Sequence, residues 1–348
     1  MASMRAVFLT GHGGNEVVAL DRRPMPVRGP GEVLVRIRAA GLNRVDLYMR
    51  DSGAGITHRL PLVMGLDGAG EVVEVDAGER RLARGQKVVI HPGLGCGRCE
   101  FCARGEHVLC TAMQFMGEHV DGTLRDYASV PAQNVFPMPE GYDFAEAAAL
   151  ATAPLTAWRM VFTKANVRPQ DSVLIFGIGG SVSLSALQLV KMTGARAFVT
   201  SRDAEKRARA LALGADAAID SAADVAREVM ALTGGRGVDV VIENVGEAVW
   251  PAALRALVRG GRIVTCGATS GDQPAADLRR MFIRQLQVLG STHGTFSEFA
   301  DLLAVCGRGQ FRPHIDSRFA FDDIHAALDR LASSAQFGKI AITLPDAP

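Results

Sequence analysis

A glycine-rich turn between an apolar strand and a helix restricts the fold of this chain more than any other feature. The strand segment SVLIF precedes the turn, and the helical pattern SLSALQLVKM follows it directly. Glycines at such a junction let the backbone approach a pyrophosphate, whose charge the unpaired amides of the helix N-terminus stabilise. The third glycine of the usual fingerprint is absent, and Ser183 stands near its place. The turn predicts dinucleotide binding, with a tight structural turn as the alternative. The candidate phosphate-binding residues are Gly177, Gly179, Gly180, Ser181 and Val182.

Apolar strands alternate with amphipathic helices from Asp171 to about Gly290, in the runs SVLIFG, ARAFVTS, DAAID, VDVVIEN, GGRIVTCG and LQVLGS. This alternation predicts a doubly wound parallel sheet of the α/β class. The front of the chain shows short β runs divided by Pro and Gly, typical of a barrel-like unit. The tail has a polar helix, an extended stretch, an Ala- and Leu-rich helix and a last strand, GKIAITL, and we expect it to fold back onto the front unit. We predict two domains: residues 154–291, and residues 1–153 together with 292–348.

Four cysteines lie in the fifteen-residue segment CGRCEFCARGEHVLC, at Cys96, Cys99, Cys102 and Cys110. Thiolates two residues apart can surround one ion, and a fourth from a short loop completes a tetrahedral sulfur shell. The spacing predicts one structural zinc ion, because a closed shell leaves no open coordination position for chemistry. Free thiols, disulfides and an iron–sulfur cluster are the alternatives.

The tip of the second strand of the alternating region indicates which dinucleotide is bound. An acidic residue usually holds a cofactor without a 2′-phosphate, whereas a 2′-phosphate requires hydroxyls and cations. The tip offers Ser201 and Arg202, and Lys206 lies one turn into the next helix, while Asp203 is a competing carboxylate. This pattern favours NADP(H) over NAD(H).

Charge and composition narrow the classes of partner. Lys and Arg total 38 against 37 Asp and Glu, a net charge of +1, so nothing indicates nucleic acid or an anionic membrane as a partner. A small molecule is the expected partner. The N-terminal segment MASMRAVFLTGHGG is too short in apolar residues for a secretory signal or a membrane span. We therefore expect a cytoplasmic protein.

Six segments in series resemble the zinc-containing alcohol dehydrogenase and quinone oxidoreductase superfamily, the medium-chain dehydrogenases/reductases. They are AAGLNRVDLYMR, PLVMGLDGAGEVVEV, CGRCEFCARGEHVLC, FGIGGSVSLSALQLVK, TGGRGVDVVIENVG and GGRIVTCGATSG. The resemblance implies a GroES-like β-barrel catalytic domain and a Rossmann domain. It also implies that strand-end residues line the ribose and carboxamide of the cofactor, namely Asn244, Val245, Gly246, Cys266, Gly267 and Ala268. Ser291 follows another strand end and is a candidate to reach the nicotinamide.

This chain departs from the zinc alcohol dehydrogenases at the positions of their catalytic zinc ligands. Asn43, Leu66 and Thr152 stand where those enzymes have ligands, and Val45 replaces the hydroxyl of their proton relay. Amide, alkyl and hydroxyl groups do not make a thiolate and imidazole zinc shell. The sequence therefore predicts a structural zinc without a catalytic one.

The segment from Asn43 to Tyr48 is similar to the N-x-x-D/E-x-Y segment of zinc-free quinone and enone reductases. By this resemblance Asn43 and Tyr48 are candidate hydrogen-bond donors to the developing oxyanion, and Thr156 is expected to touch the nicotinamide. Loop bracing by Asn43 and packing by Tyr48 are the alternatives. His293 is a second candidate proton donor beside Tyr48.

These observations predict an NADPH-dependent oxidoreductase that transfers hydride to a quinone or α,β-unsaturated carbonyl without a catalytic metal. Two alternatives remain open: an alcohol dehydrogenase that recruits a metal unconventionally, and a non-catalytic NADPH-binding sensor. The habit of the family further suggests a homodimer or homotetramer.

Overall fold

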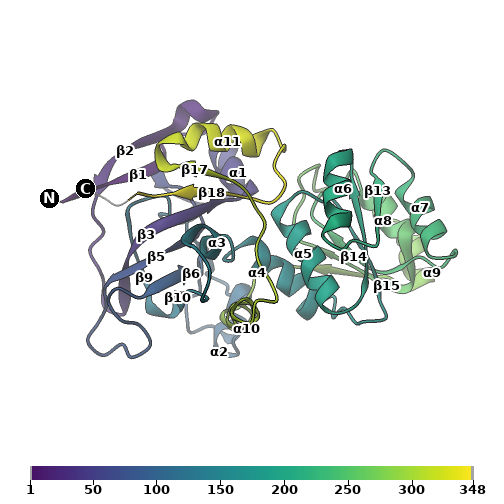
Figure 1. Ribbon diagram of the computed structural model, residues 1–348, viewed down its shortest axis with the longest axis horizontal. Coiled ribbons are helices and arrows are strands. Elements are labelled where there is room, and N and C mark those ends of the chain that lie inside the picture. The colour runs from purple at the N-terminus through teal and green to yellow at the C-terminus, as the bar shows by residue number, and fades with distance from the viewer. Residues whose placement is uncertain (1, 346–348) are drawn as a thin grey trace. The chain divides into compact units, whose positions relative to one another are not determined.

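The computed structural model describes residues 2–345, which form two compact units (Figure 1). Of these, unit 1 comprises residues 2–153 and 295–345, and unit 2 comprises Pro154–Gly294. The second boundary lies three residues after the one predicted at residue 292. No helix among the described residues is both long and apolar enough to cross a membrane.

Unit 1 is a β-rich barrel built mainly from antiparallel strands. Its larger sheet has the order β10-β6-β5-β3-β18-β17, with β9 also paired to β3, and a second sheet has the order β2-β1-β4. A short hairpin of β7 and β8 stands apart. The strands are β1 (Ser3–Leu9), β2 (Val18–Pro24), β3 (Glu32–Leu42), β4 (Leu62–Val63), β5 (Asp67–Glu74), β6 (Lys87–Ile90), β7 (Gly93–Leu94), β8 (Gln114–Phe115), β9 (Tyr127–Pro131), β10 (Val135–Pro137), β17 (Ile315–Ala320) and β18 (Lys339–Thr343).

The C-terminal tail completes unit 1, as the sequence predicts. The yellow strand β18 pairs antiparallel with the purple strand β3, with Ile340 opposite Leu42 (Figure 1). The α-helices of unit 1 are α1 (Arg44–Ser52), α2 (Glu100–Ala103), α3 (Phe144–Ala148), α10 (Phe296–Gly307) and α11 (Ile324–Ala332). The expectation that the first tail helix is polar is wrong: α10 buries Phe299, Leu302 and Cys306 against the unit. Its apolar residues recur at helical spacing and form one packed face.

Unit 2 is a six-stranded parallel sheet in the order β13-β12-β11-β14-β15-β16. This is the doubly wound order in which ligands bind beyond the carboxyl ends of the strands, at the reversal between β11 and β14. The elements are α4 (Ala153–Trp158), β11 (Ser172–Ile175), α5 (Ser181–Met192), β12 (Arg196–Ser201), α6 (Ala204–Ala212), β13 (Ala217–Asp220), α7 (Val225–Leu232), β14 (Val238–Glu243), α8 (Trp250–Ala256), β15 (Leu257–Thr265), α9 (Leu278–Arg284) and β16 (Gln287–Gly290).

Both faces of the central strands in this sheet are covered. Val173, Leu174 and Ile175 are successive residues of β11, so their side chains point to alternate faces, and all three are fully buried. Leu174 belongs to a core cluster that also contains residues of α7 and α8. The apolar runs predicted as strands are therefore the buried centre of a layered α/β unit.

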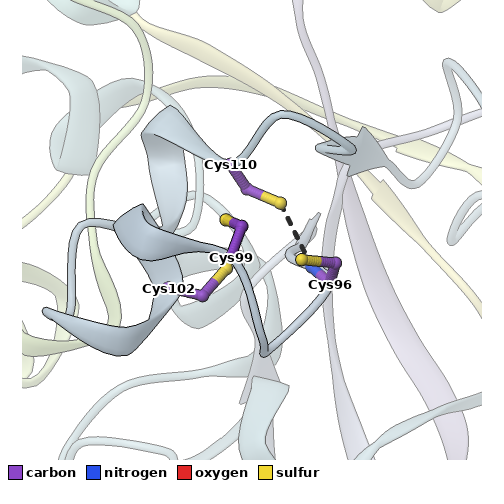
Figure 2. Close-up of side chains that lie close together, drawn as sticks. All are labelled: Cys96, Cys99, Cys102 and Cys110. Carbon is purple, nitrogen blue, oxygen red and sulfur yellow. Dashed lines mark hydrogen bonds between the residues drawn. The ribbon is translucent and has the colours of Figure 1, made fainter.

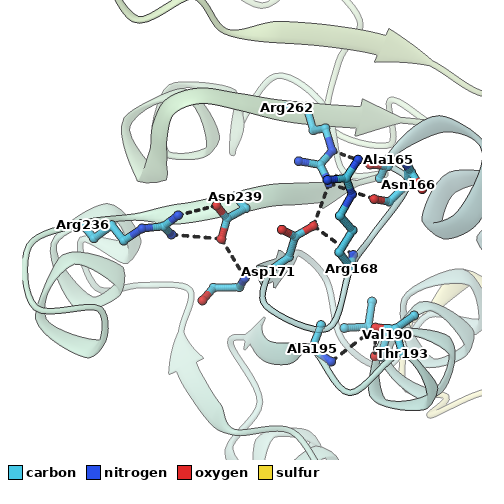
Figure 3. Close-up of polar contacts among 11 residues, drawn as sticks. Ala165, Asn166, Arg168, Asp171, Val190, Thr193, Ala195, Arg236, Asp239 and Arg262 are labelled. Atoms are coloured by element: carbon cyan, nitrogen blue, oxygen red, sulfur yellow. Dashed lines mark hydrogen bonds and ion pairs between the residues drawn. The ribbon is translucent and has the colours of Figure 1, made fainter.

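Charged side chains tie together the amino-terminal edge of the same sheet (Figure 3). Asp171, just before β11, accepts a hydrogen bond of 2.7 Å from Arg262 of β15. Asp239 of β14 accepts from Arg236 at 2.6 Å and from the backbone N–H of Ser172 at 2.9 Å. These contacts fix the strand ends opposite to the edge where the predicted cofactor residues lie.

Candidate functional site

The glycine-rich turn has the backbone that a phosphate-binding loop requires. Gly177 and Gly179 have φ of +69° and +122°, in the region that favours glycine. A Cβ on Gly179 would stand 2.9 Å from the Lys206 Cδ and 3.4 Å from its Nζ. The Lys206 side chain therefore lies against the turn at a distance that only a glycine at position 179 allows. Turn and lysine together fit an anionic cofactor.

Two hydroxyls hold this turn in place. Thr200, at the end of β12, accepts a hydrogen bond from the backbone N–H of Gly177 at 3.2 Å. Ser183 donates from its hydroxyl to the Phe176 carbonyl at 2.8 Å and is 1% exposed. The hydroxymethyl group at the place of the third glycine is thus accommodated because its oxygen bonds back to the strand.

The tip of β12 presents hydroxyl and cationic groups, while its carboxylate is already engaged. Asp203 accepts hydrogen bonds from the backbone N–H groups of Glu205 at 2.8 Å and Lys206 at 3.1 Å, and so caps the N-terminus of α6. Ser201 is buried and Arg202 is exposed. A carboxylate used as a helix cap is less available to a ribose hydroxyl.

The other candidate cofactor residues lie at the carboxyl ends of neighbouring strands. Asn244 and Val245 follow β14, Cys266, Gly267 and Ala268 follow β15, and Ser291 follows β16. Because these strands are parallel, their carboxyl ends share one edge with the glycine turn. Burial raises the pKa of Cys266 to about 12, so its thiol is neutral.

A buried carboxylate organises this edge. Glu243, the last residue of β14, is fully buried and accepts hydrogen bonds from the backbone N–H groups of Val245 and of Gly246, the latter at 2.6 Å. It also accepts from the Thr265 hydroxyl, at the end of β15, at 3.0 Å. Burial raises the pKa of Glu243 although these donors oppose the rise. The carboxylate thus connects the loops after two strands.

Thr156 and His293, both expected near the nicotinamide, lie in unit 2 as buried residues. Thr156 belongs to α4 and is 7% exposed. His293 is 4% exposed, has a φ of +47°, and its Nδ1 lies 3.3 Å from the Gly294 carbonyl oxygen.

The four cysteines of the predicted zinc site converge in unit 1 (Figure 2). Their sulfur atoms all lie within 4.8 Å of one another. The Cys110 Sγ accepts hydrogen bonds from the backbone N–H groups of Cys96 at 3.2 Å and Ala112 at 3.4 Å. The backbone N–H of Cys102 lowers the pKa of Cys99 to about 6, whereas burial raises that of Cys102 to about 12. Four sulfurs this close, one favoured as thiolate, fit a structural zinc ion.

The residues that stand where zinc alcohol dehydrogenases have their catalytic zinc ligands form a different kind of site. Asn43 stands between β3 and α1, Leu66 is 2% exposed, and Val45 packs against the apolar core of unit 1. Within residues 2–345, the cysteine cluster is the sole group of three or more His, Cys, Asp or Glu side chains close enough to share one ion. The side chains at these positions thus offer no second zinc-binding set.

Asn43, Asp67 and Lys339 instead form a buried polar group, which we call the Lys339 cluster. The Lys339 ammonium donates to Asn43 Oδ1 at 2.6 Å and to Asp67 Oδ2 at 2.7 Å. The Asn43 Nδ2 donates to the same Asp67 oxygen at 3.1 Å. Asp67 is fully buried and Lys339 is 2% exposed. Here a lysine provides the positive charge among these polar side chains.

Two more carboxyl groups are linked electrostatically to this cluster, Asp46 directly and Glu118 through Asp46. Asp46 Oδ2 accepts from the Asn43 backbone N–H at 2.7 Å, which braces the start of α1. Burial raises the pKa of Asp46 to about 7, and the charge of Asp67 adds to the rise. Burial likewise raises the pKa of Glu118 to about 7, with Asp46 as the second cause. Both groups are therefore partly protonated near neutral pH.

Tyr48 presents a hydrogen-bonding group that the protein leaves unused. Its hydroxyl oxygen is buried and has no hydrogen-bond partner within residues 2–345. The same is true of the Oδ1 atoms of Asp46 and Asp67. Since buried polar groups are normally paired, an unpaired phenol is a candidate contact for a bound molecule.

Several residues of these sites were not among the sequence-based candidates, namely Asp67, Glu118, Thr200, Glu243, Thr265 and Lys339. Glu243 and Lys339 stand at the ends of strands β14 and β18, and the Lys in GKIAITL and the Glu in VDVVIEN interrupt strongly apolar runs. For these two residues, a charged side chain in an apolar run was the available signal.

Comparison with known proteins gives consistent matches over the whole chain. Residues 29–140 match the family described as alcohol dehydrogenase GroES-like domain, and residues 181–307 match zinc-binding dehydrogenase. A protein named NAD-dependent alcohol dehydrogenase from Sulfolobus acidocaldarius is 32% identical over 346 residues, 97% of this chain and 98% of that protein.

Solved structures agree with these matches. A crystal structure of an NAD-dependent alcohol dehydrogenase has 39% identity and a TM-score of 0.95, covering 98% of this chain and all of that one. A crotonyl-CoA carboxylase/reductase has 26% identity and a TM-score of 0.90, covering 98% of this chain and 88% of that one.

Proposed function

Because the chain belongs to the zinc-type medium-chain dehydrogenase/reductase superfamily, we propose that it is an NADPH-dependent oxidoreductase that reduces quinones or α,β-unsaturated carbonyl compounds without a catalytic metal. Membership makes it an oxidoreductase with an α/β fold of two domains. The acceptor, the cofactor and the absence of metal from the chemistry are the proposal.

The contact between Lys339 and Asn43 carries this proposal. The ammonium donates a hydrogen bond of 2.6 Å to Asn43 Oδ1, which is the one side-chain oxygen by which this residue could bind a metal. Leu66 and Val45 add only alkyl groups nearby. A dication at Asn43 would meet a buried positive charge of the protein, which is costly in a medium of low dielectric.

A site without a Lewis acid needs an acceptor that is already electron-poor, such as a quinone or an enone. When bound, the nicotinamide would supply the hydride. Negative charge then develops on the acceptor oxygen, and the unpaired Tyr48 hydroxyl and the Asn43 amide are the candidate donors to it. Tyr48 is the candidate proton donor as well.

The proposed preference for NADPH rests on the tip of β12. A 2′-phosphate would meet the hydroxyl of Ser201 and the cations Arg202 and Lys206, while the Asp203 carboxylate caps α6. We expect Arg202→Ala and Lys206→Ala each to raise the Kd for NADPH about tenfold and to leave that for NADH nearly unchanged. Titration of cofactor fluorescence measures both constants, with Arg209→Ala in the same helix as control. Equal losses for both cofactors would contradict the assignment.

The known proteins support two candidate reactions. Crotonyl-CoA is an α,β-unsaturated thioester, so the crotonyl-CoA carboxylase/reductase favours enone reduction on a similar fold. The relatives named alcohol dehydrogenase, two of them NAD-dependent, favour oxidation of an alcohol with NAD as the second candidate.

A cofactor-oxidation screen separates these reactions. NADPH and NADH are each tested with quinones, enones, unsaturated acyl thioesters and saturated aldehydes, and bound zinc is counted. We expect NADPH-dependent reduction of quinones or enones with one zinc per chain. Two zincs and turnover of saturated aldehydes would establish the alcohol dehydrogenase, and NADPH binding without any turnover would indicate a sensor.

The same screen tests the two donors. We expect Asn43→Ala and Tyr48→Phe to lower kcat by about 100-fold, the loss typical of one oxyanion donor. Tyr127→Phe, on β9, is the matched control and should keep wild-type kcat. Full activity in both variants would refute the assignment of these residues.

We also propose that unit 2 pairs with a second copy of the chain. Strand β16 is an edge of the sheet with Val288 39% exposed, and the preceding helix α9 exposes Leu278 and Phe282 to 67% and 70%. Unpaired strand edges beside apolar patches favour association. Light scattering should give a dimer or tetramer, and Phe282→Glu with Val288→Lys should reduce its mass. A wild-type monomer would contradict this.

A further inference from the structure

The ammonium of Lys339 is fully used inside the protein. Its three hydrogens have three acceptors: Asp67 Oδ2 at 2.7 Å, Asn43 Oδ1 at 2.6 Å and the Leu42 carbonyl oxygen at 3.3 Å. The side chain is 2% exposed, so water contributes little to its solvation. A lysine buried in this way is costly unless every contact is made, and here each one is made.

Three neighbouring strands bring this cluster together. β18 begins at Lys339, β5 begins at Asp67 and β3 ends one residue before Asn43, and β3 lies between the other two in the sheet. Gly41 of β3 pairs with Asp67, and a Cβ on this glycine would stand 2.6 Å from Asp67 Oδ2. The sheet thus leaves a space that the carboxylate fills.

The ammonium settles how the Asn43 amide is oriented. An ammonium can only donate, so the atom facing it must be the Asn43 oxygen, and the amide nitrogen must face the other way. One N–H of that nitrogen points to Asp67, and the Gly41 carbonyl oxygen is at 3.5 Å, the limit of a hydrogen bond. The second N–H is therefore only weakly held and is available to another acceptor.

We propose that Lys339 is a positioning residue that orients and polarises the Asn43 amide, so that its second N–H donates to the oxygen of the reduced substrate. Charge on one end of an amide strengthens the hydrogen bonds made by the other end, most strongly where water is excluded. The internal ammonium would thus act on the developing oxyanion through Asn43. This inference rests on the proposed function of Asn43 as a donor.

A double-mutant cycle tests the coupling. We expect Lys339→Met to lower kcat at least about tenfold while the KM for NADPH stays within about twofold, because the cofactor residues lie in unit 2. In an Asn43→Ala background, Lys339→Met should have little further effect on kcat. Lys87→Met, a lysine at the surface of unit 1, is the control. Equal losses of kcat in both backgrounds would overturn the proposal.

Loss of folding is separated from loss of polarisation by two further variants. The pair Lys339→Met with Asp67→Asn leaves no buried unpaired charge, and it should fold yet keep the low kcat. In Lys339→Ala, added ethylammonium should restore kcat, whereas ethanol should not. A folded double variant with wild-type kcat, or equal rescue by ethanol, would refute the role of the charge.

An NMR measurement keeps this test distinct from that of the proposed function. The Asn43 side-chain amide of the full-length protein, labelled with ¹⁵N-asparagine and assigned with Asn43→Ala, should shift on Lys339→Met whatever the substrate is. An unchanged resonance would overturn the proposed orientation and polarisation. Failure of the wild type to reduce any quinone or enone would instead refute the proposed function.

Discussion

The four-cysteine cluster and the Lys339 cluster lie in the same unit, yet their charges are balanced in different ways. In the first, the sulfur of Cys110 accepts hydrogen bonds from backbone amides, and the four sulfurs face one another within 4.8 Å. In the second, Asp67 faces the ammonium of Lys339 at 2.7 Å. The first cluster fits a cation from outside the chain, whereas the second contains one.

Under the proposed function, one domain keeps a metal at one place and does without it at another. Thiolates that converge repel one another until an ion joins them, so a bound zinc would contribute to folding. A carboxylate paired with a lysine needs no ion but is fixed by the sheet that carries both. The zinc would therefore stabilise the loop, and the lysine would order the polar side chains of the proposed active site.

The largest expected effect is the loss of the zinc site. Cys102→Ser together with Cys110→Ser should remove the bound zinc and lower the free energy of unfolding by more than about 4 kcal/mol. Metal analysis and calorimetry measure both, and Cys306→Ala is the control for metal content, because this thiol lies outside the cluster. A zinc-free variant with an unchanged Tm would show that the cluster has no structural role.

A somewhat smaller loss is expected from the Lys339 cluster. Asp67→Asn leaves the ammonium of Lys339 buried without its carboxylate, which should cost about 3–5 kcal/mol in urea denaturation. Asp322→Asn is the control, since this carboxylate is 74% exposed and lies 3.9 Å from Arg5. That substitution should cost less than about 1 kcal/mol. Similar losses in the two variants would remove the distinction between buried and exposed pairs.

The smallest effect is a pH dependence of stability that comes from Asp46, the carboxyl group beside the Lys339 cluster. Burial raises the pKa of Asp46 to about 7, above the unfolded value of about 3.9. The folded chain thus binds more protons between these values, so this group's contribution to stability falls as pH rises from about 4 to 7 and is constant above.

Asp46→Asn removes this titration. The variant should gain about 1–2 kcal/mol of stability relative to the wild type between pH 5 and pH 7. Urea denaturation across this range measures the gain, and Asp51→Asn, on the exposed side of the same helix, should show none. A constant difference between Asp46→Asn and the wild type at all pH values would contradict the raised pKa.

Much of the fold follows from periodicity in the chain. Runs such as SVLIFG and VDVVIEN became β11 and β14 because short continuous apolar runs suit strands buried on both faces, and the helical pattern after the glycines became α5. The first tail helix was misjudged because its charged residues concealed an apolar face that includes Phe299 and Leu302.

Sites whose residues lie close together in the sequence, such as the cysteine cluster and the glycine turn, were determined by the sequence alone. The four cysteines lie within fifteen residues, so their spacing was sufficient to predict that the thiols converge. The glycine turn was equally local, since strand, turn and helix follow one another directly. In both cases the chain between the residues is too short to place them far apart.

Only the tertiary structure decided what Asn43 contacts. Asp67 is 24 residues away and Lys339 is 296 residues away, and the three meet because β18 returns to pair with β3. No local pattern encodes the distance between residues so far apart, since it is set by the register of strands that the whole barrel fixes. The sequence alone identified Asn43 as a candidate, whereas the pairing of β18 with β3 placed the charge of Lys339 beside it.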